Sequence, residues 1–215
     1  MMTAMLTARN ILAGERCLDL VNTLDNRPVP EKKLELLPDY ASFAMWAEQA
    51  GIISRQKRQR LCEVALADPA RATNVLSWVI ELRESLYRIF DRIVGEQQPP
   101  KSDLDLVAHF LAQSYRAVRF RSTHGVYQLD WQDGEQLESP LWPIVRSASS
   151  LLTSPDLKLV RKCSVETCRW LFVDRSKNHS RRWCDMKICG NRTKARKYYS
   201  RTKVDAGEGA RATQQ

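Results

Sequence analysis

The sequence predicts an α+β fold that is mainly α-helical, with a larger N-terminal domain and a small basic C-terminal domain. Three observations support this prediction. Apolar residues recur in steps of three and four through much of residues 1–156, an alternating segment follows at residues 118–122, and four cysteines form two pairs within residues 163–189. Steps of three and four are typical of helices that bury one face, whereas alternation is typical of strands.

The first helix is expected to carry the apolar residues from Cys17 to Leu24 and to end at the stretch 26–30, which contains two prolines. A second helix should begin after Asp39 and a third after Ser54. Asp and Ser side chains accept hydrogen bonds from the free amides of a first helical turn, so both residues are expected to act as caps.

The fourth helix has the clearest signals. Asp68 can cap it, Pro69 suits its first position, and Gly95 is placed to end it. Its apolar residues lie three or four positions apart, at Val75, Val79, Leu82, Leu86, Ile89 and Ile93. That spacing puts all six on one face. A fifth helix is expected over residues 102–111.

A small β-hairpin is predicted next, because residues 118–122 alternate, His124-Gly125 suits a turn, and residues 126–131 are rich in strand formers. A short helix should follow before Ser154-Pro155-Asp156, which marks a boundary. We therefore divide the chain into a helical domain at 1–156, a cysteine-rich domain at 157–203 and a disordered tail at 204–215.

The charge of the chain is concentrated at one end. The net charge is +9 at pH 7, and residues 161–203 hold 14 Lys and Arg against three acidic residues, whereas residues 1–160 hold 19 basic and 20 acidic residues. This asymmetry indicates a polyanionic partner for the C-terminal domain. We expect a cytoplasmic protein without a membrane partner, because neither a membrane span nor a signal peptide is evident.

Cys163 and Cys168 form the first cysteine pair, and Cys184 and Cys189 form the second, with fifteen residues between the pairs. This spacing is typical of a tetrahedral site in which four thiolates hold one structural Zn²⁺. Two disulfides, His179 as a ligand, or an iron–sulfur cluster are less favoured alternatives. A domain of about 40 residues with few large apolar side chains cannot fold by burial alone, so the metal should decide whether it folds.

The residues after Cys189 are predicted to form a basic helix. With a hairpin expected between the two cysteine pairs, the order suggests a treble-clef-like or ribbon-like zinc finger. Candidate nucleic-acid contacts are Arg181, Arg182, Arg192, Lys194, Arg196, Lys197 and Arg201. Cationic stripes on a helix suit phosphate contacts, and Arg192 could reach base edges in a major groove. A basic surface that binds an acidic protein is the alternative.

Asp19 and Asn22 are polar residues on the otherwise apolar first helix, and their spacing of three puts them on one face. One interpretation is hydrogen bonding between the helix and a loop. The other is the polar floor of a pocket for a small-molecule effector, which would make the N-terminal domain a sensor. No catalytic signature stands out in the sequence, so we do not expect an enzyme.

Two motifs resemble a known bacterial family. Cys189-Gly190-Asn191-Arg192, preceded by Arg181-Arg182-Trp183-Cys184, resembles the CGNR zinc finger, and Cys17 to Leu24 resembles the opening of the ABATE domain that usually precedes it. The resemblance implies a stress-induced transcription regulator whose finger binds DNA, with the four cysteines as zinc ligands. Leu20 stands where such openings often carry Phe. Arg192 in the signature is either a DNA contact or a structural partner of Asp174.

We therefore expect a regulator that binds double-stranded DNA through the finger, with the N-terminal domain as a sensor or interaction module. The alternative function is an RNA- or ribosome-associated zinc protein, in which Trp183, Tyr198 or Tyr199 would stack on bases. A homodimer is a further expectation, since a lone finger covers few base pairs.

Overall fold

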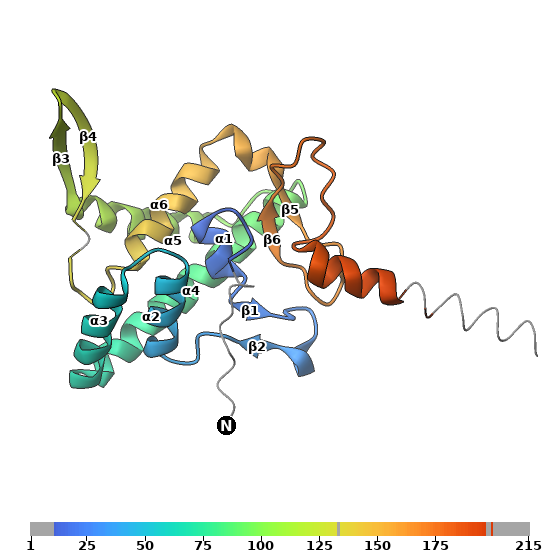
Figure 1. Cartoon of the computed structure of the whole chain (residues 1–215), viewed down its shortest axis with the longest axis horizontal. Coiled ribbons are helices and arrows are strands. Elements are labelled where there is room, and N and C mark those ends of the chain that lie inside the picture. Colours follow the sequence, from blue (N-terminus) through green and yellow to red (C-terminus); the bar gives the residue numbers. More distant parts are fainter. Residues whose placement is uncertain (1–10, 133, 197–198, 200–215) are drawn as a thin grey trace, which may run out of the picture.

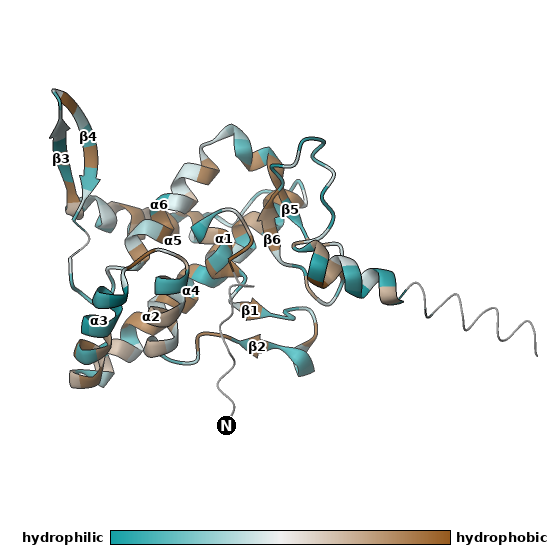
Figure 2. Cartoon of the chain, viewed as in Figure 1, coloured by the Kyte–Doolittle hydropathy of each residue, from teal (hydrophilic) through white to brown (hydrophobic). Residues whose placement is uncertain are grey.

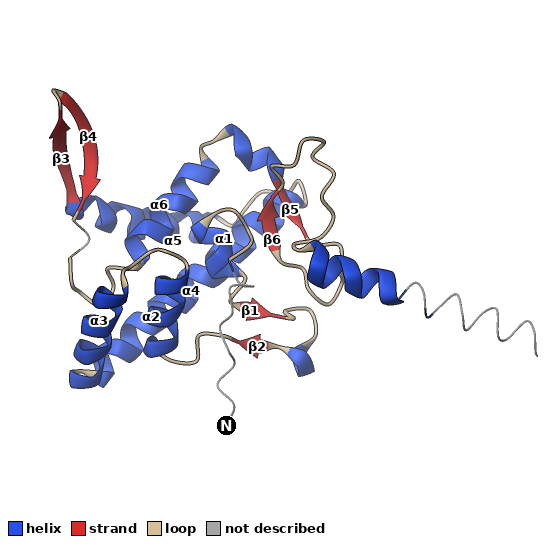
Figure 3. Ribbon diagram, in the orientation of Figure 1, coloured by secondary structure: helices blue, strands red, loops and turns tan. Residues whose placement is uncertain are grey.

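The computed structural model describes residues 11–132, 134–196 and 199. A body of helices carries a projecting β-hairpin on one side and the cysteine-rich finger on another (Figure 1). Helices dominate, and the strands among the described residues form three two-stranded antiparallel sheets (Figure 3). The predicted fold class, α+β and mainly α-helical, is confirmed. The predicted disordered tail, 204–215, lies outside the described residues.

The elements follow one another along the chain much as expected. The helices are α1 (Arg16–Val21), α2 (Tyr40–Gln49), α3 (Arg55–Ala67), α4 (Pro69–Val94), α5 (Lys101–Ser114) and α6 (Leu141–Leu152). The strand pairs are β1 (Leu24–Asp25) with β2 (Leu34–Glu35), β3 (Val118–Thr123) with β4 (Val126–Trp131), and β5 (Val160–Lys162) with β6 (Leu171–Val173). Among these described helices, none is both long and apolar enough to cross a membrane.

The long helix α4 is the central helix of the body. Asp68 Oδ1 accepts the Arg71 N–H at 3.0 Å, and Gly95 follows its last residue. The predicted apolar positions from Val75 to Ile89 are buried, and α1, α2, α3 and α5 all pack against this helix. Its predicted start, end and buried face are therefore confirmed.

The predicted caps of α2 and α3 are also confirmed. Asp39 Oδ1 accepts the Ser42 N–H at 2.7 Å, and Ser54 Oγ accepts the Lys57 N–H at 3.1 Å. Trp46 on α2 is fully buried. Burial of an aromatic side chain of this size contributes about 1.5–3 kcal/mol or more, so α2 is held mainly by its apolar face.

The first helix is shorter than the sequence suggested, and the expected place of Leu24 is wrong. α1 ends at Val21, and Leu24 lies in β1, where it pairs with Glu35. The Thr23 hydroxyl donates to the Leu20 carbonyl at 2.7 Å, which satisfies one of the free carbonyls at the helix end. The apolar spacing continued past the helix because Leu24 is half-buried in the strand that follows.

The β3–β4 hairpin matches the prediction and projects into solvent. Its turn has positive φ at His124 (50°) and Gly125 (80°), the backbone of a tight two-residue hairpin loop. Phe120 and Leu129 face each other across the strands and are 75% and 54% exposed. Figure 2 shows apolar residues on both strands of this hairpin. The hairpin therefore presents an apolar face that the body does not cover.

The finger shares one continuous apolar core with the helical body. β5 contacts α4, and β6 contacts α1. Leu171 and Phe172 are fully buried, and the four cysteines belong to the same cluster of buried residues as the helices. The finger is therefore stabilised by packing against the body as well as by its metal site. The sequence did not predict this packing, because the finger has few large apolar side chains.

Candidate metal centre

The four cysteine sulfurs converge on one point. One sulfur from each of Cys163, Cys168, Cys184 and Cys189 lies within 4.8 Å of all the others, and all four residues are buried. The Cys168–Cys184 and Cys184–Cys189 sulfur pairs are each 3.6 Å apart. Sulfurs bound to zinc at 2.3 Å in a tetrahedron lie about 3.8 Å from one another. The cluster is therefore a closed site for one structural zinc ion.

The distances between these sulfur atoms are too long for a pair of disulfides. Sulfur atoms in a disulfide lie about 2.05 Å apart. All six cysteines, which fall within the described residues, are free thiols. His179 does not join the cluster, because its Nδ1 lies 2.9 Å from the Asp174 carbonyl oxygen. The expectation of four thiolate ligands without His179 is borne out.

The β5–β6 hairpin positions the first cysteine pair. The Cys163 N–H donates to the Trp170 carbonyl at 2.8 Å, and the Cys168 N–H donates to the Val165 carbonyl at 2.9 Å. Arg169 has a φ of 58°, so the chain turns sharply just after the second sulfur. This knuckle aims both sulfurs at the same point.

A helix start positions the second pair. Met186–Gly190 forms a π-helical turn, and residues 191–196 continue as an α-helix. Asp185 caps the turn: its Oδ1 accepts the Ile188 N–H at 2.8 Å, and its carbonyl accepts the Cys189 N–H at 3.0 Å. Cys189 therefore lies in the first turn. The sequence prediction did not include Asp185 as a cap, although an Asp directly before an apolar residue, here Met186, is a recognisable cap signal.

The hairpin is not where the sequence suggested. The expectation of a hairpin between the two pairs is wrong, because β6 pairs with β5, which precedes Cys163. The hairpin therefore encloses the first pair. A knuckle within a hairpin and a helix that supplies the second pair give a treble-clef-like arrangement.

Asp174 and Arg181 brace the loop between the two pairs. The buried Asp174 carboxylate accepts the Ser176 N–H at 3.0 Å, the Ser176 hydroxyl at 2.6 Å and the Arg181 N–H at 2.8 Å. Burial opposes ionisation, but these hydrogen bonds outweigh it and lower the pKa of Asp174. Arg192 is exposed and is not among these partners. The structural alternative for Arg192 is therefore wrong.

Arg181 itself is turned inward. Its guanidinium donates to the carbonyls of Trp183, at 2.9 Å, and Cys184, and it lies over the Phe172 ring at 4.3 Å. These contacts connect the second cysteine pair to the buried strand β6. A role in holding the metal site accounts for Arg181 better than the nucleic-acid contact that the sequence suggested.

The four thiols of the site shift one another's pKa in opposite directions. Hydrogen bonds from the other three thiols, with that of Cys168 the largest contribution, lower the pKa of Cys163, whereas hydrogen bonds within the same cluster, first that of Cys163, raise the pKa of Cys168 and of Cys184. A thiolate is the form that binds metal. By contrast, burial raises the pKa of Cys17 to about 12. Cys17 is therefore a core residue and not a metal ligand.

The remaining candidate contacts form an exposed basic surface on the finger. Arg182, Arg192, Lys194 and Arg196 are exposed, and no hydrogen bond or ion pair joins them to another residue that the structure describes. Lys177 and Lys187 share this exposure and were overlooked in the sequence. Figure 2 shows hydrophilic residues along most of the finger's loop and helix. Lys197 and Arg201 lie outside the described residues.

Comparison with known families agrees with this architecture. The model of the ABATE family, described as "Putative stress-induced transcription regulator", matches residues 14–155. The chain belongs to the ABATE family. The CGNR zinc finger matches residues 160–202, so the ABATE domain is followed directly by a CGNR finger. No curated protein matches the chain.

Asp19 and Asn22, which the sequence places on one face of a helix, have different surroundings in the ABATE domain. Asn22 faces the CGNR finger: its Nδ2 donates to the Leu171 carbonyl at 2.9 Å, and its Oδ1 accepts the Leu171 N–H at 3.0 Å. Asn22 is therefore not part of a pocket floor, and that expectation is wrong. The alternative of hydrogen bonding from the helix is correct for Asn22, although its partner is a strand.

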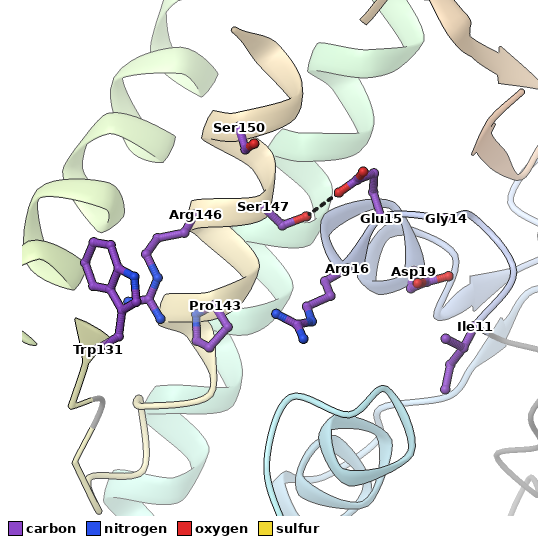
Figure 4. Close-up of a pocket in the computed structure, with 10 residues that line it drawn as sticks. All are labelled: Ile11, Gly14, Glu15, Arg16, Asp19, Trp131, Pro143, Arg146, Ser147 and Ser150. Carbon is purple, nitrogen blue, oxygen red and sulfur yellow. Dashed lines mark hydrogen bonds between the residues drawn. The ribbon is translucent and has the colours of Figure 1, made fainter. Parts of the chain in front are cut away.

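Asp19 does line a cavity of the ABATE domain (Figure 4). The cavity has a volume of about 610 Å³, and its polar and aromatic walls come from Glu15, Arg16, Asp19, Trp131, Arg146 and Ser147. Asp19 Oδ1 accepts the Ala13 N–H at 2.9 Å. Burial raises the pKa of Asp19 to about 6, against the effect of its backbone hydrogen bonds.

Proposed function

We propose that this protein is a transcription regulator, not an enzyme, that binds double-stranded DNA through the CGNR finger while the ABATE domain acts as a sensor. The exposed cations on a metal-held helix carry this proposal. Arg192 and Arg196 lie one helical turn apart on the segment 191–196, and both are exposed. Arg181 donates hydrogen bonds to backbone carbonyls within the finger, whereas Arg192 and Arg196 have no hydrogen-bond or ion-pair partner among the described residues.

The geometry suits a duplex. A major groove about 12 Å wide admits an α-helix, and side chains near the start of that helix can reach base edges. The finger's helix begins at its metal site, so the zinc fixes the direction in which Arg192 and Lys194 project. Contacts to phosphates would supply affinity, and contacts to bases would supply sequence preference.

A sequence-selection experiment on random duplex DNA tests the proposal. Zinc-loaded full-length protein should enrich a short motif and should retain it against excess random duplex. Structured RNA and single-stranded RNA serve as competitors. Failure to enrich any duplex sequence would overturn the proposal.

The second candidate function, an RNA- or ribosome-associated protein, is favoured by the 66% exposure of Tyr199 and by Trp183, over which Arg182 lies at 5.8 Å. Aromatic side chains on a basic surface can stack on unpaired bases. In the same experiment, RNA that displaces the protein from its selected duplex at equal concentration would favour this alternative.

Homodimerisation and a cytoplasmic location both stay predictions. A dimer that binds DNA would select two half-sites at a fixed spacing, about one helical turn or a multiple of it. The selected motif therefore tests the dimer directly, and sedimentation of the protein with the selected duplex gives the stoichiometry.

A further inference from the structure

We infer that the ABATE cavity binds a small organic anion and that the wall of this cavity transmits its occupancy to the finger. The binding half of this inference stands alone. The transmission half rests on the proposed sensor role, and it deepens that role by naming the ligand class and the connecting residues.

The charges of the cavity favour an anion. Arg16 extends from α1 toward Pro143, and the Arg146 guanidinium lies 4.0 Å from the centre of the Trp131 ring (Figure 4). Arg16 has no hydrogen bond or ion pair with any residue of the described chain. A guanidinium offers a planar set of donors that matches a carboxylate or phosphate.

The acidic residues of the cavity are already engaged. Glu15 Oε1 accepts from Arg175 at 2.6 Å, and its Oε2 accepts the Ser147 hydroxyl at 3.1 Å. Asp19 Oδ1 accepts the Ala13 N–H. Both carboxylates are therefore used within the protein, and the guanidinium of Arg16 is left to attract a ligand.

The volume and the lining of the cavity indicate which kind of anion would fit. A volume of about 610 Å³ lies within the range of about 300–1,000 Å³ that is typical of small-molecule sites. Ile11, Trp131 and Pro143 give the cavity apolar surfaces beside the two guanidiniums. These features fit a carboxylate carried on a compact apolar body better than an inorganic ion.

The cavity wall is also the segment that holds the finger. The Ala13 carbonyl accepts the Val173 N–H at 2.8 Å, and the Gly14 carbonyl accepts from Arg175 Nη1 at 3.0 Å. Asp19, on the cavity side, fixes the amide of the same Ala13 at 2.9 Å. One short segment therefore faces a ligand site on one side and strand β6 on the other.

These contacts define how occupancy reaches the finger. A ligand that bridges Arg16 on α1 and Arg146 on α6 would order the segment beside Ala13 and Gly14. Ligands shift a conformational equilibrium only through unequal affinity for its states, so the ordered state must bind the anion better. The hydrogen bond from Val173 to Ala13 should then open less often.

Binding is tested with benzoate as the probe and zinc-loaded full-length protein. Calorimetric titration at pH 7.5 should show benzoate binding, and neutral benzamide of the same shape should bind more weakly. Arg16→Gln should weaken benzoate binding by about tenfold or more, because it removes a charged hydrogen-bond donor. Arg55→Gln is the matched control, since Arg55 is an exposed arginine of the body without a described partner.

Equal affinity for benzoate and benzamide, or unchanged benzoate affinity in Arg16→Gln, would overturn the anion site. Transmission is tested by hydrogen exchange at the Val173 amide with and without benzoate, at a concentration near the dissociation constant of the wild type. Exchange should slow in the wild type and slow much less in Arg16→Gln. An unchanged exchange rate at the Val173 amide of the wild type with benzoate bound would refute transmission. Neither readout uses DNA, so failure of the DNA-binding proposal would leave both results interpretable.

Discussion

Asn22 of the ABATE domain exchanges two hydrogen bonds with the backbone of Leu171 in the finger, at 2.9 and 3.0 Å. The two residues are 149 positions apart in the sequence. Both are buried, so the carboxamide satisfies a donor and an acceptor that water cannot reach. This pair, together with the bond from Val173 to Ala13, fixes strand β6 on α1.

Asn22→Ala should destabilise the junction between the domain and the finger while leaving zinc bound. The substitution leaves the Leu171 N–H and carbonyl without partners, at a cost of about 2–4 kcal/mol in the free energy of unfolding. Urea unfolding measures the loss. Asn178→Ala, in the exposed loop, is the control and should change stability by less than about 0.5 kcal/mol. Equal stability of the two variants would contradict the role of Asn22.

Cys184→Ser should remove the metal. Wild-type protein purified under reducing conditions should hold one zinc per chain, and the variant should hold none after exposure to a competing chelator. Amide NMR signals of the knuckle 163–168 and of residues 184–190 should lose dispersion. Strand β6 should keep more order, because Leu171 and Phe172 pack on the body. Cys62→Ser should retain zinc, and a chelated wild type with an unchanged spectrum would argue against a structural metal.

The raised pKa of Asp19 gives a pH dependence with a definite sign. Because burial raises the pKa from 3.8 to about 6, the folded state holds its proton longer than the unfolded state, and stability falls as pH rises through this window. Asp19→Asn removes this pH-dependent contribution to stability and keeps a side-chain oxygen that can accept the Ala13 N–H. The free energy of unfolding of the variant minus that of the wild type should rise by about 1–2 kcal/mol between pH 5 and 7.5.

Taking this difference cancels the pH dependence of zinc binding, which the two proteins share. Urea unfolding of both proteins at pH 5.0, 6.0 and 7.5 provides the measurement. A difference that stays constant, or falls, across this range would show that Asp19 does not titrate there.

Removal of two finger cations should change the salt dependence of nucleic-acid binding. Each lost phosphate contact lowers the slope of log affinity against log salt by about 0.9 for duplex DNA. The double substitution Arg192→Gln and Arg196→Gln should therefore lower the slope by about 2 if both residues contact phosphate. Zinc content should not change. Arg55→Gln, on the body, should leave the slope as in the wild type.

The projecting hairpin should contribute little to the stability of the body. Phe120→Thr and Leu129→Thr together should change the free energy of unfolding by less than about 0.5 kcal/mol, since both side chains are largely exposed. Phe43→Ala, in the fully buried core, should cost about 3–5 kcal/mol. Thermal unfolding distinguishes these outcomes, and a large loss in the hairpin variant would show that its apolar face is covered in solution.

Local chemistry explains which features could be predicted. The caps at Asp39, Ser54 and Asp68 act within three residues, so the sequence is enough to place the helices that follow. The four cysteines were readable because ligand spacing reflects the geometry of the metal. The turn at His124 and Gly125 was readable from the residue types that tolerate positive φ.

Long-range contacts explain the rest. Nothing near Asn22 in the sequence identifies Leu171 as its partner, so its polar character suggested a pocket instead. The pairing of β5 with β6 was missed because β5 lies before the first cysteine and is only three residues long. Arg181 resembles its exposed neighbours in the sequence, because its contacts with Phe172 and Cys184 are set by the folded loop and not by the residue type.

The burial of strand β6 limits how this finger could be transplanted. A cassette cut at residues 160–202 would carry Leu171 and Phe172 without the helix that shields them, and it would leave two backbone groups of Leu171 facing solvent. Exchange of this finger for that of another family member would therefore require residues 11–22 to be exchanged with it. In this respect the chain is one structural unit, even though two family descriptions divide it.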